Sequence, residues 1–337
     1  MLHSILAALG LAAGLRTAAH ERFIAESALC KVPKGLDAAA SSLLARGEVL
    51  VEPGRDASLH PMLIPLTRNA DGEVTGLLRW PGAGTGWRGT TLPLVRTAQG
   101  GQQLRLLADS CADFVTREAV LADAREGSDA AEAASLAASI GFTVTPGEAA
   151  ATPGGLAGYL LLKTQTPAAQ DYEERAAAHR ERGDTQSALI ACEASELRFG
   201  RWGRPYSFHA ALLEESGRAE EARDVARQAL ALPLWTAGHD LEALATLACT
   251  TIDELVAKAR LASEGKLTEE QLRVQNYHEE RSPAQIARDR ASAMLDLVAL
   301  CPEEYTYASA RPELAELWRA SELEEFADFV EATGATP

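Results

Sequence analysis

The chain of 337 residues is 47% hydrophobic and carries a formal net charge of −16 at pH 7. Its length allows two or three domains with substantial cores, and its composition excludes a wholly disordered protein. The acidic balance argues against a nucleic-acid partner, because affinity for a phosphate backbone comes largely from Lys and Arg that release counterions. No apolar run approaches the roughly 18 residues that a membrane-spanning helix requires, so we expect no membrane span.

Apolar residues at the beginning of the chain, from Leu2 to Leu29, recur at helical spacing and predict an amphipathic helix. The run from 4 to 15 resembles the core of a signal peptide. However, no Lys or Arg precedes this run, and Arg16 follows it. Secretion is therefore not expected.

The five cysteines are odd in number and widely spaced, which fits free thiols in a reducing compartment. Cys192 and Cys249 fall on apolar stretches of predicted helices, where a thiol usually serves as a small core residue. The seven histidines are scattered, and none has a partner at metal-ligand spacing. We therefore expect no metal and no cofactor.

Between about 45 and 100 the sequence changes from Ala-rich helix to strand and turn. Short strands are predicted at 48–51, 62–67, 74–80 and 92–97. The middle two form a predicted hairpin, because Asp71-Gly72 between apolar runs favours a tight reversal. Gly84 to Gly89 spells G-x-G-x-x-G, but Thr90 to Pro93 cannot begin a long helix. We therefore interpret this stretch as a loop and not as a nucleotide site.

Helical spacing returns after the predicted strands. Leu104, Leu107 and Cys111 predict a helix from 103 to about 125, and 130–140 predicts another. Residues 1–140 are therefore interpreted as a small α+β domain. The Pro and Gly residues of 141–168 predict a linker after it.

The next segment contains two stretches related by a period of 34 residues. The shared positions are Tyr172, Ala176, Ala177, Glu181, Gly183 and Ala188 in one stretch and Tyr206, Ala210, Ala211, Glu215, Gly217 and Ala222 in the other. This pattern resembles the tetratricopeptide repeat (TPR), in which small residues let paired helices cross closely and a Gly ends the first helix. Helices are predicted at 169–182, 185–197, 205–216 and 219–231. A weaker pair at 239–249 and 253–262 extends the repeat region, so that it covers 169–265.

Residues 266–337 are predicted to form an acidic helical region. Ser282-Pro283 has the residue types that begin a helix, and Pro302 and Pro312 are expected to break helices. The predicted fold class is therefore mostly α: an α-solenoid of TPR-like helix pairs with a small N-terminal α+β domain.

The TPR resemblance implies protein binding, because stacked helix pairs present an extended surface to a partner. TPR clamps for acidic heat-shock tails use Lys and Asn on their first helices. Here those positions hold Glu173, Ala177 and Phe208, which argues against that type of co-chaperone. The layout of the chain also resembles uncharacterised TPR-like proteins of plants and algae. That resemblance implies a chloroplast location, with the cytoplasm as the alternative.

The segment between the two repeats places three arginines around a large aromatic residue. An exposed Trp flanked by Arg suits a partner that carries carboxylates and apolar anchors, because Trp and Arg dominate binding energies at interfaces. The predicted partner-binding residues are Arg198, Arg201, Trp202, Arg204, Glu173 and Phe208. The alternative is that Trp202 packs between helix pairs while the arginines are solvated.

The leading hypothesis for function is a protein-interaction scaffold or assembly factor for a larger complex. No nucleophile or metal signature occurs in the sequence, which favours a protein that is not an enzyme. One alternative is an enzyme whose site lies in the N-terminal α+β domain. Another is a permanent structural subunit of a large complex, which the sequence does not distinguish from an assembly factor.

Overall fold

A computed structural model describes residues 17–81, 92–97, 101–125, 129–238, 240–267 and 281–334. The chain divides into two compact units. Unit 1 contains residues 1–54, 63–97 and 106–184, and unit 2 contains residues 55–62, 98–105 and 185–337. The first half of the predicted N-terminal helix and the Gly84 to Gly89 loop lie outside the described residues.

Unit 1 is built on a sheet whose five strands follow one another in chain order. The strands are β1 (Val49–Leu50), β2 (Leu63–Arg68), β3 (Val74–Leu78), β4 (Leu94–Thr97) and β5 (Leu104–Ala108). The pairs from β1 to β4 are antiparallel. The predicted hairpin is confirmed: the Asn69 N–H donates to the Glu73 carbonyl at 3.0 Å, and Gly72 takes the left-handed conformation of the turn.

A glycine is required where β2 and β3 approach each other. The register shifts between Pro65 and Thr67, which marks a bulge opposite Gly76. A Cβ at Gly76 would collide with the carbonyl oxygen of Ile64. The bulge is thus compatible with pairing only because residue 76 has no side chain.

The helix that the sequence predicts from residue 103 is wrong over its first turns, because β5 occupies Leu104–Ala108. Leu104, Leu106 and Ala108 are buried and Arg105 is exposed, which is the alternation of a strand. Helix α4 (Cys111–Ala124) begins only after Ser110, whose hydroxyl accepts from the Asp113 N–H at 3.1 Å.

The helices of unit 1 pack around the sheet and around one another. They are α2 (Ala18–Glu26), α3 (Leu36–Ala45), α4, α5 (Ala130–Ser139), α6 (Glu148–Ala151), α7 (Gly155–Tyr159), the π-helical turn η1 (Leu160–Thr164) and α8 (Ala169–Glu181). Helix α3 lies against β1 and β2 and contacts α4 and α5. The predicted linker 141–168 contains α6, α7 and η1, where Tyr159 and Leu160 are buried against Val120.

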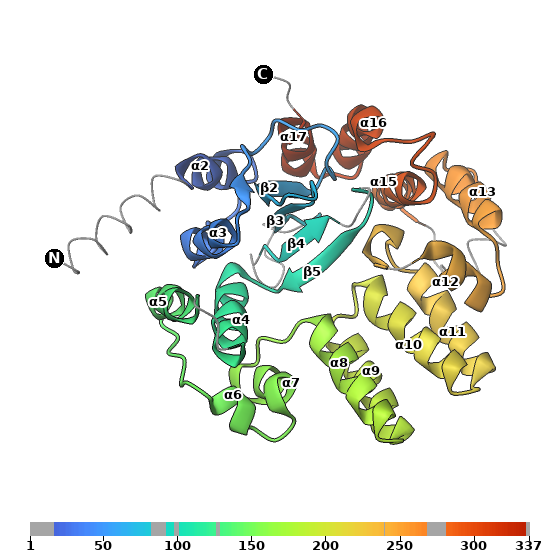
Figure 1. Cartoon of the computed structure of the whole chain (residues 1–337). Helices are drawn as coiled ribbons and strands as arrows, with labels where there is room; N and C mark the ends of the chain where they lie inside the picture. The colour runs from blue at the N-terminus through green and yellow to red at the C-terminus, as the bar shows by residue number, and fades with distance from the viewer. Residues whose placement is uncertain are drawn as a thin grey trace. The chain divides into compact units, whose positions relative to one another are not determined.

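The elements of unit 2 after residue 184 are helical. They are α9 (Thr185–Arg198), α10 (Gly203–Glu215), α11 (Ala219–Leu230), η2 (Leu234–Thr236), α12 (Leu241–Leu247), α13 (Ile252–Ser263), α15 (Pro283–Leu300), α16 (Tyr307–Ala320) and α17 (Glu324–Ala332). The helices predicted at 185–197, 205–216 and 219–231 agree with α9, α10 and α11 to within two residues at each end. Figure 1 shows α10 and α11 side by side, as their packing requires.

The small residues of the repeat lie where they were predicted. Ala210 and Ala222 are fully buried, and Gly217 ends the turn after α10 with a left-handed backbone. The surrounding apolar cluster contains Ala210, Ala226, Ala229, Leu234, Ala237, Leu241, Leu244 and Ala248. The α10–α11 pair therefore packs through short side chains, among them Ala210 of the 34-residue pattern and Ala226 and Ala229 of α11.

Two sequence expectations in unit 2 are wrong. Pro312 lies inside α16 and does not break it, because the buried Leu314 and Trp318 anchor the helix and offset the missing N–H. Cys249 is exposed and has a left-handed backbone just after α12, so it is not a core residue. Cys192 is buried as expected, and all five cysteines are free thiols.

Candidate functional site

The corner between α9 and α10, taken here as residues 198–208, carries five of the six predicted partner-binding residues. Trp202 is only 7% exposed, and its ring centroid lies 6.4 Å from that of Trp235 in an edge-on contact. The Gly203 N–H next to it donates to the Thr236 hydroxyl at 2.8 Å. These contacts attach the corner to η2. Trp202 therefore packs between helices, as the alternative interpretation expected.

The arginines around this corner differ in exposure. Arg198 and Arg201 are exposed, whereas Arg204 is half-buried and donates to the Gly238 carbonyl at 3.2 Å. The Arg204 guanidinium also lies 5.9 Å from the ring centroid of Phe208, one turn further along α10. Partial burial lowers the pKa of Arg201. Glu173 is half-buried on α8, which belongs to unit 1.

The outer face of α9 carries two large apolar side chains that the sequence reasoning missed. Leu197 is 90% exposed and Ile190 is 52% exposed. The buried side of α9 consists of Ala188, Leu189, Ala191, Cys192 and Ser195, most of which are small, and α9 contacts α10. The repeat carries a signal for the exposure of Ile190, because the residue 34 positions later is Asp224, a charged residue that lies on the exposed side of α11.

A second group of unusual residues lies inside unit 2, around the segment 55–62. The His60 side chain is fully buried, and its ring centroid lies 4.4 Å from that of Trp235 and 4.8 Å from that of Tyr307. Burial lowers the pKa of His60 to about 3, with a smaller contribution from the charge of Arg311. The His60 imidazole is therefore neutral, and it accepts from the Met62 N–H at 3.3 Å.

Arg311 on α16 holds the same segment in place. Its guanidinium donates to the carbonyls of Leu59 at 2.8 Å, Val330 at 2.9 Å and Ala57 at 3.2 Å, and also to the Thr333 hydroxyl. Burial lowers the pKa of Arg311 to about 10. These bonds join the segment 55–62 to α16 and α17. The donors of Arg311 are directed at the chain's own backbone, which indicates a structural role.

Two further titratable groups complete this interior cluster. The Asp296 carboxylate accepts from the Leu234 N–H at 2.7 Å, and burial raises its pKa from 3.8 to about 7. The Tyr307 hydroxyl donates to the Gln102 carbonyl at 2.7 Å, and burial raises its pKa well above 10.0. Perturbed groups often mark catalytic sites. Here each one bonds to a backbone group of unit 2. His60 and Arg311 bond within the segment 55–62, Tyr307 bonds to the segment 101–105, and Asp296 bonds to η2.

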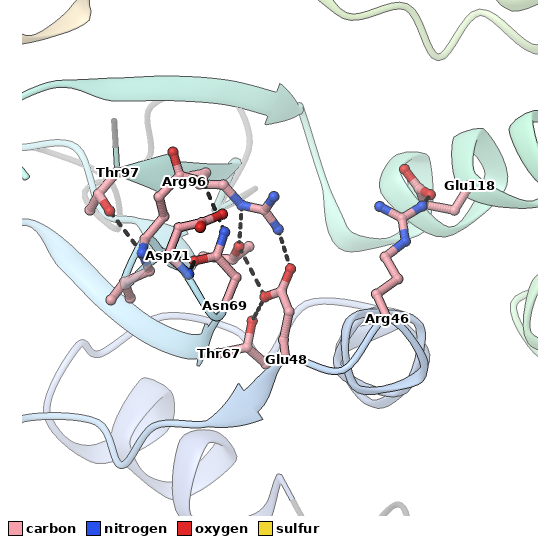
Figure 2. A network of polar contacts seen from close by, with 11 residues as sticks. Arg46, Glu48, Thr67, Asn69, Asp71, Arg96, Thr97 and Glu118 are labelled. Carbon is pink, nitrogen blue, oxygen red and sulfur yellow. Dashed lines mark hydrogen bonds and ion pairs between the residues drawn. The ribbon is translucent and has the colours of Figure 1, made fainter. Parts of the chain in front are cut away.

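Within unit 1, a polar network crosses the sheet (Figure 2). The buried Glu48 carboxylate pairs with Arg96 and accepts from the Thr67 hydroxyl at 2.6 Å. Arg96 also donates to the Thr75 hydroxyl at 2.8 Å. A separate ion pair between Arg46 and Glu118 joins α3 to α4. The Glu48 carboxylate is engaged on both oxygens, which favours a structural role over that of a general base.

Two negative findings apply to the part of the chain that the structure describes. In that part, no group of three or more His, Cys, Asp or Glu side chains is placed to hold a metal ion. No described helix combines the length and apolar character needed to span a membrane.

Three family models match successive parts of the chain. They are the PAB N-terminal model over residues 18–153, the PAB middle domain over 169–251 and the PAB C-terminal domain over 257–333. The N-terminal, middle and C-terminal models thus match the chain in that order. The chain is therefore similar to proteins with this three-part organisation along nearly all of its described length.

A particular relative is similar to the chain over almost its whole length. It is the Arabidopsis thaliana protein called Protein IN CHLOROPLAST ATPASE BIOGENESIS, chloroplastic, and it is 29% identical over 321 residues. The similarity covers 92% of this chain and 90% of the relative. No solved structure showed a significant similarity to the chain.

Proposed function

We propose that this protein is an assembly factor that acts in the biogenesis of a chloroplast ATPase and that it works by binding a protein subunit, without catalysing a reaction. The observation that carries the proposal is the similarity to the Arabidopsis protein, which extends over 92% of this chain and is not confined to one domain. Similarity of that extent involves both the strand-containing and the helical parts. A chloroplast location belongs to the same proposal.

The geometry supports binding more than catalysis. The perturbed His60, Asp296 and Arg311 bond to backbone groups of their own unit. The corner between α9 and α10, in contrast, presents exposed arginines on a well-packed base. A rigid base reduces the conformational entropy that is lost when a partner binds.

The proposed contact residues at this corner are Arg198, Arg201, Arg204 and Phe208, with Trp202 as their buried support. Glu173, on α8 of unit 1, is proposed as a separate contact residue. Trp202 fits the supporting role because truncating it would remove the contact with Trp235. The arginines fit direct contact because the exposed Arg198 and Arg201 flank this support.

The proposal is tested by deleting the gene in the source organism. Radiolabelled ATPase subunits should still be synthesised, whereas the fully assembled ATPase on native gels should decrease and should recover when the wild-type gene is restored. Another abundant complex of the same compartment serves as the control. Normal levels of assembled ATPase in the deletion strain would rule the proposal out.

Purification of the ATPase from the wild-type strain distinguishes an assembly factor from a permanent subunit. An assembly factor is absent from the purified, complete ATPase but co-purifies with incomplete forms. Stoichiometric presence of this protein in the complete ATPase would instead identify it as a structural subunit.

A further inference from the structure

The outer face of α9 has the composition of a binding surface. Helices of globular proteins normally place large apolar residues inward and polar residues outward. Helix α9 departs from this pattern: besides a buried side that consists of Ala188, Leu189, Ala191, Cys192 and Ser195, it exposes two further large apolar residues, Ile190 and Leu197. Of the five large apolar side chains that are exposed among the described residues, these two are the pair that shares one helix.

The two apolar residues lie on one stripe of the helix. They are seven residues apart, and two turns of an α-helix return almost to the same side after a rise of about 10 Å. Ala194 lies on the stripe between them and is exposed, so it leaves room for a side chain of a partner. A second helix with apolar residues at i, i+4 and i+7 has the matching spacing.

Charged residues beside the stripe favour one orientation of a bound segment. The exposed Glu193 lies near its middle, whereas the exposed Arg198 and Arg201 lie at its C-terminal end. A complementary segment therefore has carboxylates at the end that meets the arginines and none opposite Glu193. Charge complementarity of this kind fixes orientation and accelerates association. A uniformly basic or uniformly acidic partner would fit only part of the stripe.

We propose that the outer face of α9 binds an amphipathic helical segment of a partner protein, whose apolar side chains cover Ile190 and Leu197 and whose carboxylates pair with Arg198 and Arg201. This inference rests on the proposed function, because it names the kind of segment through which a subunit would be held. It adds Ile190 and Leu197 to the arginines of the corner.

A designed peptide provides a direct test with the full-length protein. The probe is a fluorescently labelled, Ala-based helix of about 18 residues, with leucines at i, i+4 and i+7 and two glutamates at one end. Fluorescence anisotropy measures its binding. Leu197→Ser should weaken binding by about tenfold or more, and Leu162→Ser, which alters another exposed leucine, should leave it unchanged.

Charge reversal tests the arginine part of the site. Arg198→Glu with Arg201→Glu should weaken binding of the glutamate peptide and should restore binding of a matched peptide that has lysines in place of the glutamates. Arg22→Glu, at an exposed position on α2, is the control for a change in net charge. Circular dichroism and urea unfolding check that each variant is folded.

Several outcomes would overturn the inference. It is wrong if the wild-type protein does not bind the glutamate peptide, if Leu197→Ser binds it as tightly as wild type, or if charge reversal has no effect. Binding of anionic phospholipid vesicles that is lost in Leu197→Ser, without peptide binding, would identify the face as a membrane contact instead.

The deletion strain separates this inference from the proposed function. Suppose that the wild-type gene and the Leu197→Ser, Arg198→Glu double variant restore the assembled ATPase equally well. The proposed function is then supported, and the proposal that α9 carries the binding surface is wrong. If the deletion leaves ATPase assembly unchanged, the proposed function fails, and the peptide measurements then decide the binding surface by themselves.

Discussion

Helices α9 and α11 occupy equivalent places in the 34-residue pattern, yet their outer faces differ. Their packing faces are alike, since Ala188 and Ala222 are both fully buried. On the outside, α11 carries charged residues that pair along the helix, such as Arg223 with Glu220 at 2.8 Å, whereas α9 exposes Ile190 and Leu197. Packing therefore requires a small residue at the inward position of both helices, whereas their outward residues are available for binding.

The largest loss of stability is expected from the interior of unit 2, at Arg311. Arg311→Met keeps the length of the side chain but removes every donor to the carbonyls of Ala57, Leu59 and Val330. Buried carbonyls without donors should destabilise the protein by about 3–5 kcal/mol. Urea unfolding measures this change, with the exposed Arg22→Met as the control. Equal stabilities of the two variants would show that the segment 55–62 is held by other contacts.

The buried alanines of α9 and α11 are tested by replacing each with a much larger residue. Ala188→Trp and Ala222→Trp should each cost about 1–3 kcal/mol, because the added ring cannot fit at a fully buried helix contact. The matched control is Ala194→Trp, which adds the same ring on the exposed side of α9. Unfolding midpoints in urea give the comparison. Similar shifts for Ala188 and Ala194 would mean that α9 does not pack through its small residues.

The raised pKa of the Asp296 carboxyl predicts that the stability of the protein depends on pH. The unfolded carboxyl ionises near 3.8 and the folded one near 7, so folding favours the protonated form. The contribution to stability is therefore fully present at low pH and is lost as the pH rises from about 4 to about 7. Asp296→Asn keeps an acceptor for the Leu234 N–H. It should stabilise the protein by about 2 kcal/mol more near pH 8 than near pH 4, after allowance for partial exposure.

Urea unfolding of wild type and Asp296→Asn at both pH values provides the measurement. The control is Asp240→Asn, a change at an exposed carboxylate that caps α12. A difference between Asp296→Asn and wild type that is the same at both pH values would contradict the raised pKa.

The smallest effect on stability is expected on the outer faces. Leu197→Ser and Ile190→Ser should change the free energy of unfolding by no more than about 0.5 kcal/mol, because both side chains are exposed. The reciprocal change, Asp224→Leu on α11, should be tolerated equally well. If Leu197→Ser costs as much as Ala188→Trp, the apolar face of α9 is covered within the chain.

Much of the local structure could be predicted from the sequence because its signals are local. The Asp71-Gly72 reversal specified the β2–β3 hairpin, and Gly217 specified the end of α10. For the candidate site, the sequence indicated the arginines at the corner. It did not indicate Ile190 and Leu197, because which apolar residues of a helix are exposed becomes evident only when its packed side is known.

The sequence was sufficient to predict the positions of α10 and α11 and the small residues between them, since periodicity and turn chemistry act over a few residues. Tertiary structure alone decided that Leu104–Ala108 is a strand, that α16 continues through Pro312 and that Trp202 is buried against Trp235. Tertiary structure alone also decided that His60 lies between Trp235 and Tyr307. Each of these outcomes depends on contacts between residues distant in the chain, whose burial energy exceeds the local preferences.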